Sequence, residues 1–117
     1  MAKFDVDYDP ESDDLFLSRG KSEGSIEMGD LILDFDDKKE VVGIELLNAV
    51  RFLKNAVTED IKIDKAFLAG LLKCEVETKQ QNNFLFIKIV LIGKKATVTC
   101  PINAPLIEKT SPALMYV

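Results

Sequence analysis

The sequence predicts an α+β fold that consists mainly of an antiparallel β-sheet, with one or two short helices on one face. In the first fifty residues, apolar and polar residues alternate with a period of two, and turn-forming residues separate the alternating segments. A helical pattern follows, and three strand-like segments come after it. The chain has 117 residues, of which 47% are apolar, so we expect a single domain of residues 1–117 with its own core.

Two β-hairpins are expected in the N-terminal part of the chain. Residues 4–8 and 14–18 alternate and flank a turn that contains aspartate and proline. Residues 31–35 and 41–47 form a second pair around a turn rich in aspartate and lysine. A polar loop over residues 19–24 connects the two hairpins, so residues 1–49 contain four expected strands.

The segment 50–71 has a helical pattern and predicts two short helices. Asn48 can cap the first helix, because a short polar side chain accepts hydrogen bonds from the N–H groups of a first turn. Asp64 can cap the second helix in the same way, and Gly70 is expected to end it.

The C-terminal part predicts a three-stranded meander within residues 72–102 and an extended arm over residues 103–117, where two prolines disfavour a helix. The strands are expected at 72–79, 84–92 and 96–102. The middle strand is apolar on both faces and only Lys88 interrupts it. Such a strand must be covered on both sides, and two short helices can cover only one, so we expect a homodimer. The alternative is a sheet that folds over as a sandwich, so that the monomer covers itself.

The chain carries 15 basic and 20 acidic residues, a net charge of −5, which disfavours nucleic-acid binding. The charge is uneven, since residues 1–45 carry a net −9 and residues 46–117 a net +4. Such an asymmetry predicts an acidic surface that faces solvent or a partner.

Several classes of protein are disfavoured by what the sequence lacks. It has no histidine, which excludes serine and cysteine triads and histidine-ligated metals. Its two cysteines, Cys74 and Cys100, make neither a disulfide framework nor a zinc site, so we expect a reducing cytoplasm. The charged N-terminus is not a signal peptide, and the longest apolar stretch is less than half of the ~20 residues that a membrane span needs. We therefore expect no membrane segment, no catalytic residue and no cofactor.

The expected hairpins place like charges opposite each other. In the first hairpin, one register puts Asp7 opposite Asp14, and a register shifted by two residues pairs Asp9 with Asp14 instead. In the second hairpin, the expected register puts Asp30 opposite Glu45. Opposed like charges normally destabilise a sheet, so this surface is unusual. The acidic residues expected on faces away from the core are Asp5, Asp7, Asp14, Asp30, Asp34 and Glu45.

Three interpretations of this acidic surface are open. The carboxylates can be solvated and relieved by lysines, they can bind a basic protein partner, or they can hold calcium or magnesium. The candidate ligands for such a cation are Asp7, Asp14, Asp30 and Glu45. A carboxylate pair that works as acid and base in glycoside hydrolysis is disfavoured, because no cleft can be identified around it.

Four short motifs lie in the same region of the chain. They are Tyr8-Asp9, Asp14-Leu15, Asp34-Phe35-Asp36 and Val42-Gly43-Ile44-Glu45. In this combination and spacing they make residues 4–49 resemble a small prokaryotic family called domain of unknown function 2283, and the remainder of the chain is unmatched. The resemblance implies a short bacterial or archaeal protein with an antitoxin-like or other partner-binding role.

These observations together predict a non-enzymatic module of the prokaryotic cytoplasm that binds a protein partner through its sheet surface, in an antitoxin-like role. The alternative is a protein that binds a divalent cation, calcium or magnesium, with the acidic hairpin face. The two hypotheses differ in whether the carboxylates meet the side chains of a partner or a metal ion.

Overall fold

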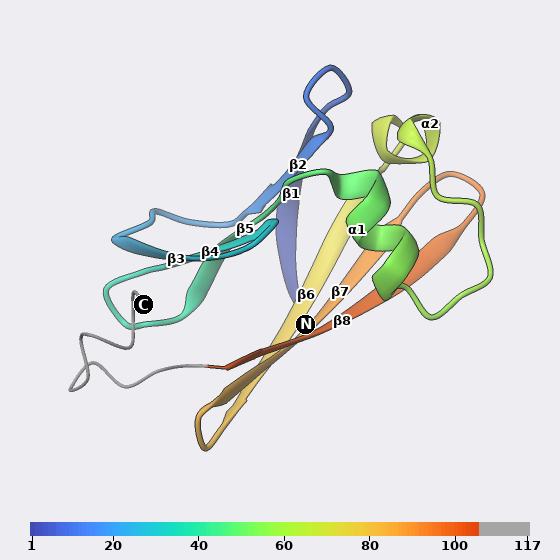
Figure 1. The fold of residues 1–117 in the computed structure, drawn as a ribbon. Helices are drawn as coiled ribbons and strands as arrows, with labels where there is room; N and C mark the ends of the chain where they lie inside the picture. The colour runs from blue at the N-terminus through green and yellow to red at the C-terminus, as the bar shows by residue number, and fades with distance from the viewer. Residues whose placement is uncertain (106–117) are drawn as a thin grey trace.

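The computed structural model describes residues 1–105, and within them eight strands form one antiparallel sheet. The strands are β1 (Ala2–Asp9), β2 (Asp14–Ser18), β3 (Gly24–Met28), β4 (Leu31–Phe35), β5 (Val41–Leu46), β6 (Lys73–Gln81), β7 (Phe84–Ile92) and β8 (Thr97–Pro105). Their spatial order is β3-β4-β5-β2-β1-β6-β7-β8, and the sheet curves into a half-barrel (Figure 1). The expected mainly antiparallel sheet is therefore confirmed.

Two short helices, α1 (Ala49–Ala56) and α2 (Lys65–Ala69), cover the concave side of the sheet. Helix α1 packs against β8 and α2 packs against β1. Each strand contributes alternate side chains to the core on this side, because successive side chains of a strand point to opposite faces. The core is apolar, since no polar or charged residue among the described residues is buried.

The N-terminal part contains five strands and not the expected four. The prediction of a polar loop over residues 19–24 is wrong at its end, because Gly24 already begins β3. Strand β3 pairs with β4 through a two-residue turn, Gly29-Asp30, in which Gly29 has a positive φ of 62°. Glycine adopts that backbone conformation without steric cost, so the turn can be tight.

The sequence allowed two registers for the first hairpin, and the structure has the one that is shifted by two residues. Asp9 lies opposite Asp14, and Asp7 lies opposite Phe16. The turn between the strands contains Asp13 with a positive φ of 59°, a conformation that aspartate tolerates better than most residues. The pairing of Asp7 with Asp14 is therefore excluded.

The predicted register of the second hairpin is wrong by two residues. Ile32, and not Asp30, lies opposite Glu45. A bulge follows Asp34, and the Asp36 carboxylate then accepts hydrogen bonds from two backbone N–H groups of the loop, each at 2.9 Å. The bulge and the hydrogen-bonded loop set the offset between β4 and β5, whereas the sequence predicted a simple four-residue turn.

Of the two predicted helix caps, the one at α2 is confirmed and the one at α1 is wrong. Asp64 caps α2 as predicted, since its carboxylate accepts a hydrogen bond from the Phe67 N–H at 2.8 Å. Asn48 does stand immediately before α1, but its φ is 52° and its side chain caps nothing. Asp13 supplies the cap instead, because its carboxylate oxygens lie 3.3 Å from the Val50 N–H.

Asp13 connects the first hairpin to α1 through its backbone carbonyl and its carboxylate. Its backbone carbonyl accepts a hydrogen bond from the Ala49 N–H at 2.9 Å, and its carboxylate binds the N–H of Val50. The Tyr8 hydroxyl donates to the same carboxylate at 2.7 Å. Burial and this hydrogen bond to an anion both raise the pKa of Tyr8 above its usual value. The β1–β2 turn is thereby held against the start of the helix.

The C-terminal meander of β6, β7 and β8 is confirmed. Strand β8 continues to Pro105, so the prediction of an arm that begins at residue 103 is wrong for its first three residues. The rest of the predicted arm, residues 106–117, lies outside the described residues. In residues 1–105, neither helix has the length and apolar character that a membrane crossing requires.

Strand β8 is the last strand of the sheet in the described part of the chain, and its outer edge is protected. The Glu59 carboxylate accepts a hydrogen bond from the Thr99 N–H at 2.8 Å, and the Thr58 N–H donates to the Thr99 carbonyl at 3.2 Å. Pro101 and Pro105 have no N–H to offer to a neighbouring strand. Such devices prevent edge-to-edge pairing of sheets.

Replacement of Asp13 tests this connection. We expect Asp13→Ala to lower the free energy of unfolding by about 1–2 kcal/mol, because it removes the cap of α1 and the acceptor for Tyr8. Asp13→Asn, which keeps an acceptor and tolerates positive φ, is expected to lose less than half of that. Urea unfolding measures both, with Asp60→Ala in an exposed loop as the control. Equal stability of Asp13→Ala and wild type would contradict this role.

Candidate functional site

The outer, convex side of the first five strands is strongly acidic. The side chains there alternate with buried core residues, so they point away from the core. We call this surface the acidic face, and its carboxylates belong to Asp5, Asp7, Asp9, Asp14, Glu27, Asp34 and Glu45. It matches the N-terminal excess of negative charge in the sequence.

The strand registers arrange the middle of the acidic face into one row across five strands. The row reads Asp7, Phe16, Glu45, Ile32 and Glu27, from β1 through β2, β5 and β4 to β3. Carboxylates therefore alternate with apolar side chains. Since neighbouring strands lie ~4.8 Å apart, successive carboxylate-bearing positions in the row are about 10 Å apart.

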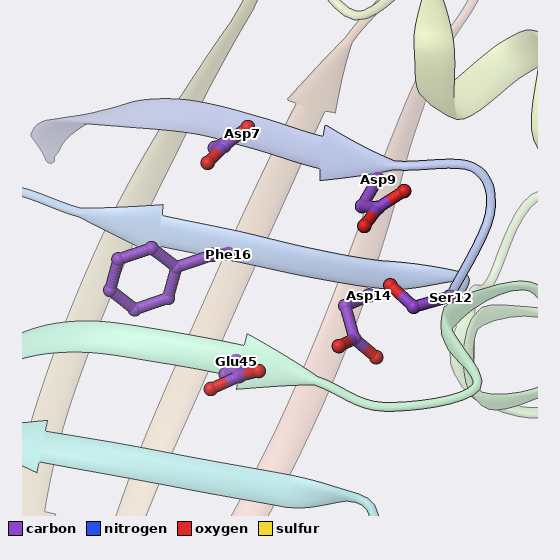
Figure 2. Close-up of a pocket in the computed structure, with 6 residues that line it drawn as sticks. All are labelled: Asp7, Asp9, Ser12, Asp14, Phe16 and Glu45. Atoms are coloured by element: carbon purple, nitrogen blue, oxygen red, sulfur yellow. The ribbon is translucent and has the colours of Figure 1, made fainter.

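One end of the acidic face forms a shallow, open depression (Figure 2). The residues that line it come from β1, β2, β5 and the β1–β2 turn, and they are Asp7, Asp9, Ser12, Asp14, Phe16 and Glu45. Figure 2 shows the carboxylates on one side of the sheet with the Phe16 ring beside them. Asp9 and Asp14 face each other directly across the hairpin. The depression therefore concentrates negative charge around an aromatic side chain.

Glu45 is electrostatically strained in this arrangement. Its pKa is raised, first because the side chain is half-buried and then because Asp14, Asp34 and Glu27 carry charge of the same sign. Phe16 and Ile32 flank it on the two neighbouring strands and reduce its contact with water. In the part of the chain that the structure describes, no lysine or arginine forms an ion pair with Glu45.

Asp9 provides a contrast within the same depression. The Glu11 N–H donates a hydrogen bond to the Asp9 carboxylate at 2.9 Å, and this bond is the main reason why the pKa of Asp9 is lowered. Asp9 is thus stabilised as an anion by its own turn. Among the described residues, no hydrogen bond or ion pair stabilises the Glu45 carboxylate as an anion in this way, so a positively charged neighbour would stabilise it.

The four predicted cation ligands do not all come together. Asp7, Asp14 and Glu45 share the depression. Asp30 lies in the β3–β4 turn, where it pairs with Arg51 at 3.1 Å and accepts a hydrogen bond from Asn48 at 3.3 Å. Residues 1–105 hold no group of three or more histidine, cysteine, aspartate or glutamate side chains placed to bind a metal ion.

Several residues of the site were absent from the sequence-based candidates. Glu27 was missed because residues 25–30 were assigned to no strand, although Ile26 and Met28 alternate with polar residues and a Gly-Asp turn follows. Phe16 and Ile32 were missed as site residues because the predicted registers placed carboxylates opposite carboxylates. The alternation of charged and apolar residues across the sheet is visible only with the correct strand offsets.

Comparison with known proteins places the chain in a family. The family model described as a protein of unknown function, DUF2283, matches residues 5–49. An uncharacterized protein of the archaeon Methanocaldococcus jannaschii is 33% identical over 101 residues, which cover 82% of this chain and 80% of the relative. This protein belongs to the DUF2283 family. No solved structure matches it.

The matched segment of the DUF2283 protein contains β2 to β5 and the part of β1 from residue 5 onward, and so all the carboxylates of the acidic face. In its Val-Gly-Ile-Glu motif, Ile44 packs in the core and Glu45 projects outward. A Cβ atom on Gly43 would lie 2.5 Å from a carboxylate oxygen of Asp34, so only glycine leaves room for that side chain. The Ser25 hydroxyl donates a hydrogen bond to Asp34 and holds it there.

The two cysteines of the DUF2283 protein are removed from this site. Cys74 and Cys100 are both buried in the core. Burial raises the pKa of each thiol to about 12, so neither is a thiolate at neutral pH. Nucleophilic chemistry through these thiols is therefore disfavoured.

The strain on Glu45 predicts a pH-dependent effect of its removal. The pKa of Glu45 in the folded protein lies above its ordinary value of 4.5. Below pH 4.5 the side chain is protonated and its effect on the free energy of unfolding is favourable. That contribution is lost as the pH rises through the pKa of the folded state, where the side chain becomes charged. Glu45→Gln stays neutral, so it should match wild type at low pH and be more stable by about 0.5 kcal/mol at pH 7.

Thermal and urea unfolding between pH 4 and pH 8 measure this difference. Added salt should reduce it, since the repulsion is between partly exposed charges. A loss of stability of about 1 kcal/mol or more in Glu45→Gln at pH 7 would show instead that Glu45 makes a hydrogen bond that the folded protein needs.

Gly43 allows a second test of the acidic face. We expect Gly43→Ala to cost about 1–3 kcal/mol, because the new methyl group displaces the Asp34 carboxylate and its hydrogen bond from Ser25. Gly24→Ala in β3 is the matched control, since nothing lies within 4 Å of a Cβ atom there. Similar unfolding free energies for the two variants would contradict the close approach of Asp34 to β5.

Proposed function

We propose that this DUF2283 protein is a non-enzymatic module that binds the basic segment of a protein partner on its acidic face. The observation that carries the proposal is geometric: the strand registers gather carboxylates on the acidic face, and among the described residues none of them forms an ion pair with a lysine or arginine. The raised pKa of Glu45, caused by burial and by like charges, supports it. A lysine or arginine from a partner would offset the repulsion between Glu45 and its acidic neighbours. The negative electrostatic potential of the acidic face would also accelerate association with a positively charged partner.

The shape of the surface supports a macromolecular partner more than a small molecule. The depression is shallow and open, whereas small-molecule sites are usually concave and mostly apolar. An extended basic segment can lie across the strands with its charges near Asp7, Glu45 and Glu27. The aliphatic stems of lysine and arginine would cover Phe16 and Ile32.

The proposal includes an antitoxin-like role in the cytoplasm. An antitoxin that acts by binding its partner needs a recognition surface, and the acidic face is suited to be one. It needs no catalytic residues. Two buried cysteine thiols that are not joined to each other suit a reducing compartment.

A charge-matched binding experiment tests the proposed function. The probe is a fluorescent ten-residue peptide of alternating arginine and threonine, and anisotropy at low salt measures its dissociation constant. We expect Glu45→Gln and Asp14→Asn each to weaken binding about 3–10-fold. Asp60→Asn removes the same charge from an exposed loop outside the acidic face and should change binding less than about 2-fold.

The competing outcomes of this titration are distinct. Equal weakening by Asp60→Asn would show that only net charge matters, and the proposal would fail. Displacement of the peptide by calcium or magnesium at constant ionic strength, but not by potassium, would favour the alternative of a cation-binding protein. Absence of binding to wild type at low salt would also contradict a basic partner.

A further inference from the structure

The outer side of β7 carries an apolar stripe, of which two residues are exposed and two are half-buried among the described residues. Its inward side chains, such as Ile89 and Leu91, are fully buried. The outward side chains that we call the apolar stripe are Phe84, Phe86, Val90 and Ile92. Phe84 is 48% exposed and Phe86 is 38% exposed, and their rings stack with centroids 6.2 Å apart. Strand β7 lies between β6 and β8, so the stripe occupies the middle of a three-stranded face.

We propose that this face is the interface of a two-fold homodimer, in which the outer sides of β6, β7 and β8 from two copies pack against each other. The surface is separate from the acidic face, so this proposal does not rest on the proposed function. Two sheets that pack face to face usually align their strands to within about 30°. An interface of this kind must be complementary to itself, because the same patch is contributed by both copies.

The order of side chains along β7 meets that requirement. Lys88 stands at the middle of the strand, with the two phenylalanines on one side of it and Val90 and Ile92 on the other. When two copies of β7 run antiparallel across a two-fold axis at Lys88, the aromatic half of each strand lies over the aliphatic half of the other. Phe86 then packs against Val90 of the partner subunit.

The charges on β6 are complementary in the same arrangement. Glu75 lies beside Val90 and Lys79 lies beside Phe86. The rotation that places Phe86 over Val90 of the partner subunit therefore also places Lys79 over Glu75 of the partner subunit. At the axis itself, Lys88 and Glu77 each lie over the same residue of the partner subunit, and their pairing at 3.9 Å within each copy offsets the repulsion between these like charges.

Other ways of pairing two copies are less favourable. The acidic face repels itself, because its charges have one sign. The outer edge of β8 is blocked by Pro101, Pro105 and the hydrogen bonds of Thr99 with residues 58 and 59. Face-to-face packing of β6, β7 and β8 needs no free edge and buries the exposed phenylalanines.

The size of the face is sufficient for a dimer of moderate affinity. A nine-residue strand is ~30 Å long and three strands span ~14 Å, so the flat footprint is roughly 400 Å² per copy. Accessible area lost on contact exceeds the flat footprint, because side chains project from the sheet. A standard interface removes about 800 Å² per partner, so we place the dissociation constant in the micromolar range.

Sedimentation equilibrium of the full-length protein between about 1 and 100 μM tests the proposal. We expect wild type to dimerise in this range and Phe86→Asp to raise the dissociation constant about 100-fold or more, because it removes an aromatic anchor and places an unpaired carboxylate against Val90 of the partner subunit. Leu72→Asp is the matched control, since Leu72 is 61% exposed and is not part of the apolar stripe. It should leave the dissociation constant unchanged.

Charge-reversal variants test the orientation and do not depend on whether Phe86→Asp folds. Glu75→Lys and Lys79→Glu should each weaken the dimer about 10-fold, and the double variant should restore it. A wild-type protein that is monomeric at 100 μM would overturn the proposal. That result is also the one expected if residues 106–117 covered the apolar stripe within each monomer. A dimer that survives Phe86→Asp, or a double variant that is not restored, would also overturn it.

Discussion

The eight strands within residues 1–105 turn one side of a single curved sheet toward the same core, and the rest of the structure depends on that constraint. The two helices fill the concave side, and side chains such as Phe4, Leu33 and Ile89 pack there with almost no exposure. Because side chains alternate along a strand, every intervening residue is placed on the convex side whatever its chemistry. The carboxylates of the N-terminal strands and the apolar residues of β7 are therefore displayed outward together, on two parts of one surface.

The two parts of the convex surface are suited to different partners. The acidic face carries charges of one sign, so it repels a second copy and favours a basic molecule. The outer side of β6, β7 and β8 carries Glu75, Glu77, Lys79 and Lys88 around an apolar stripe, a mixture that can match itself. One small domain can in this way form a dimer through its C-terminal strands and leave both acidic faces accessible.

Much of this layout could be predicted from the sequence, because apolar alternation identifies which side of a strand meets the core. The pairing of carboxylates could not, since a shift of two residues keeps every side chain on its own face and leaves the pattern unchanged. The offsets come from local features, such as the bulge after Asp34 and the positive φ of Asp13. The prediction thus gave the correct face to Glu45 but the wrong neighbour, and it included Asp30, which the β3–β4 turn removes from the site. Strand β3 was missed because it is short and begins at Gly24.

The carboxylates of the acidic face repel one another, and no ion pair within residues 1–105 relieves that repulsion. The most direct measurement is an NMR titration of the side-chain carboxyl carbon of Glu45 in the free protein, from pH 3 to pH 8. The account predicts a midpoint above the ordinary value of 4.5, and a lower midpoint once a basic peptide is bound. A midpoint at or below 4.5 in the free protein would show that Glu45 already has a stabilising neighbour, and would contradict the account.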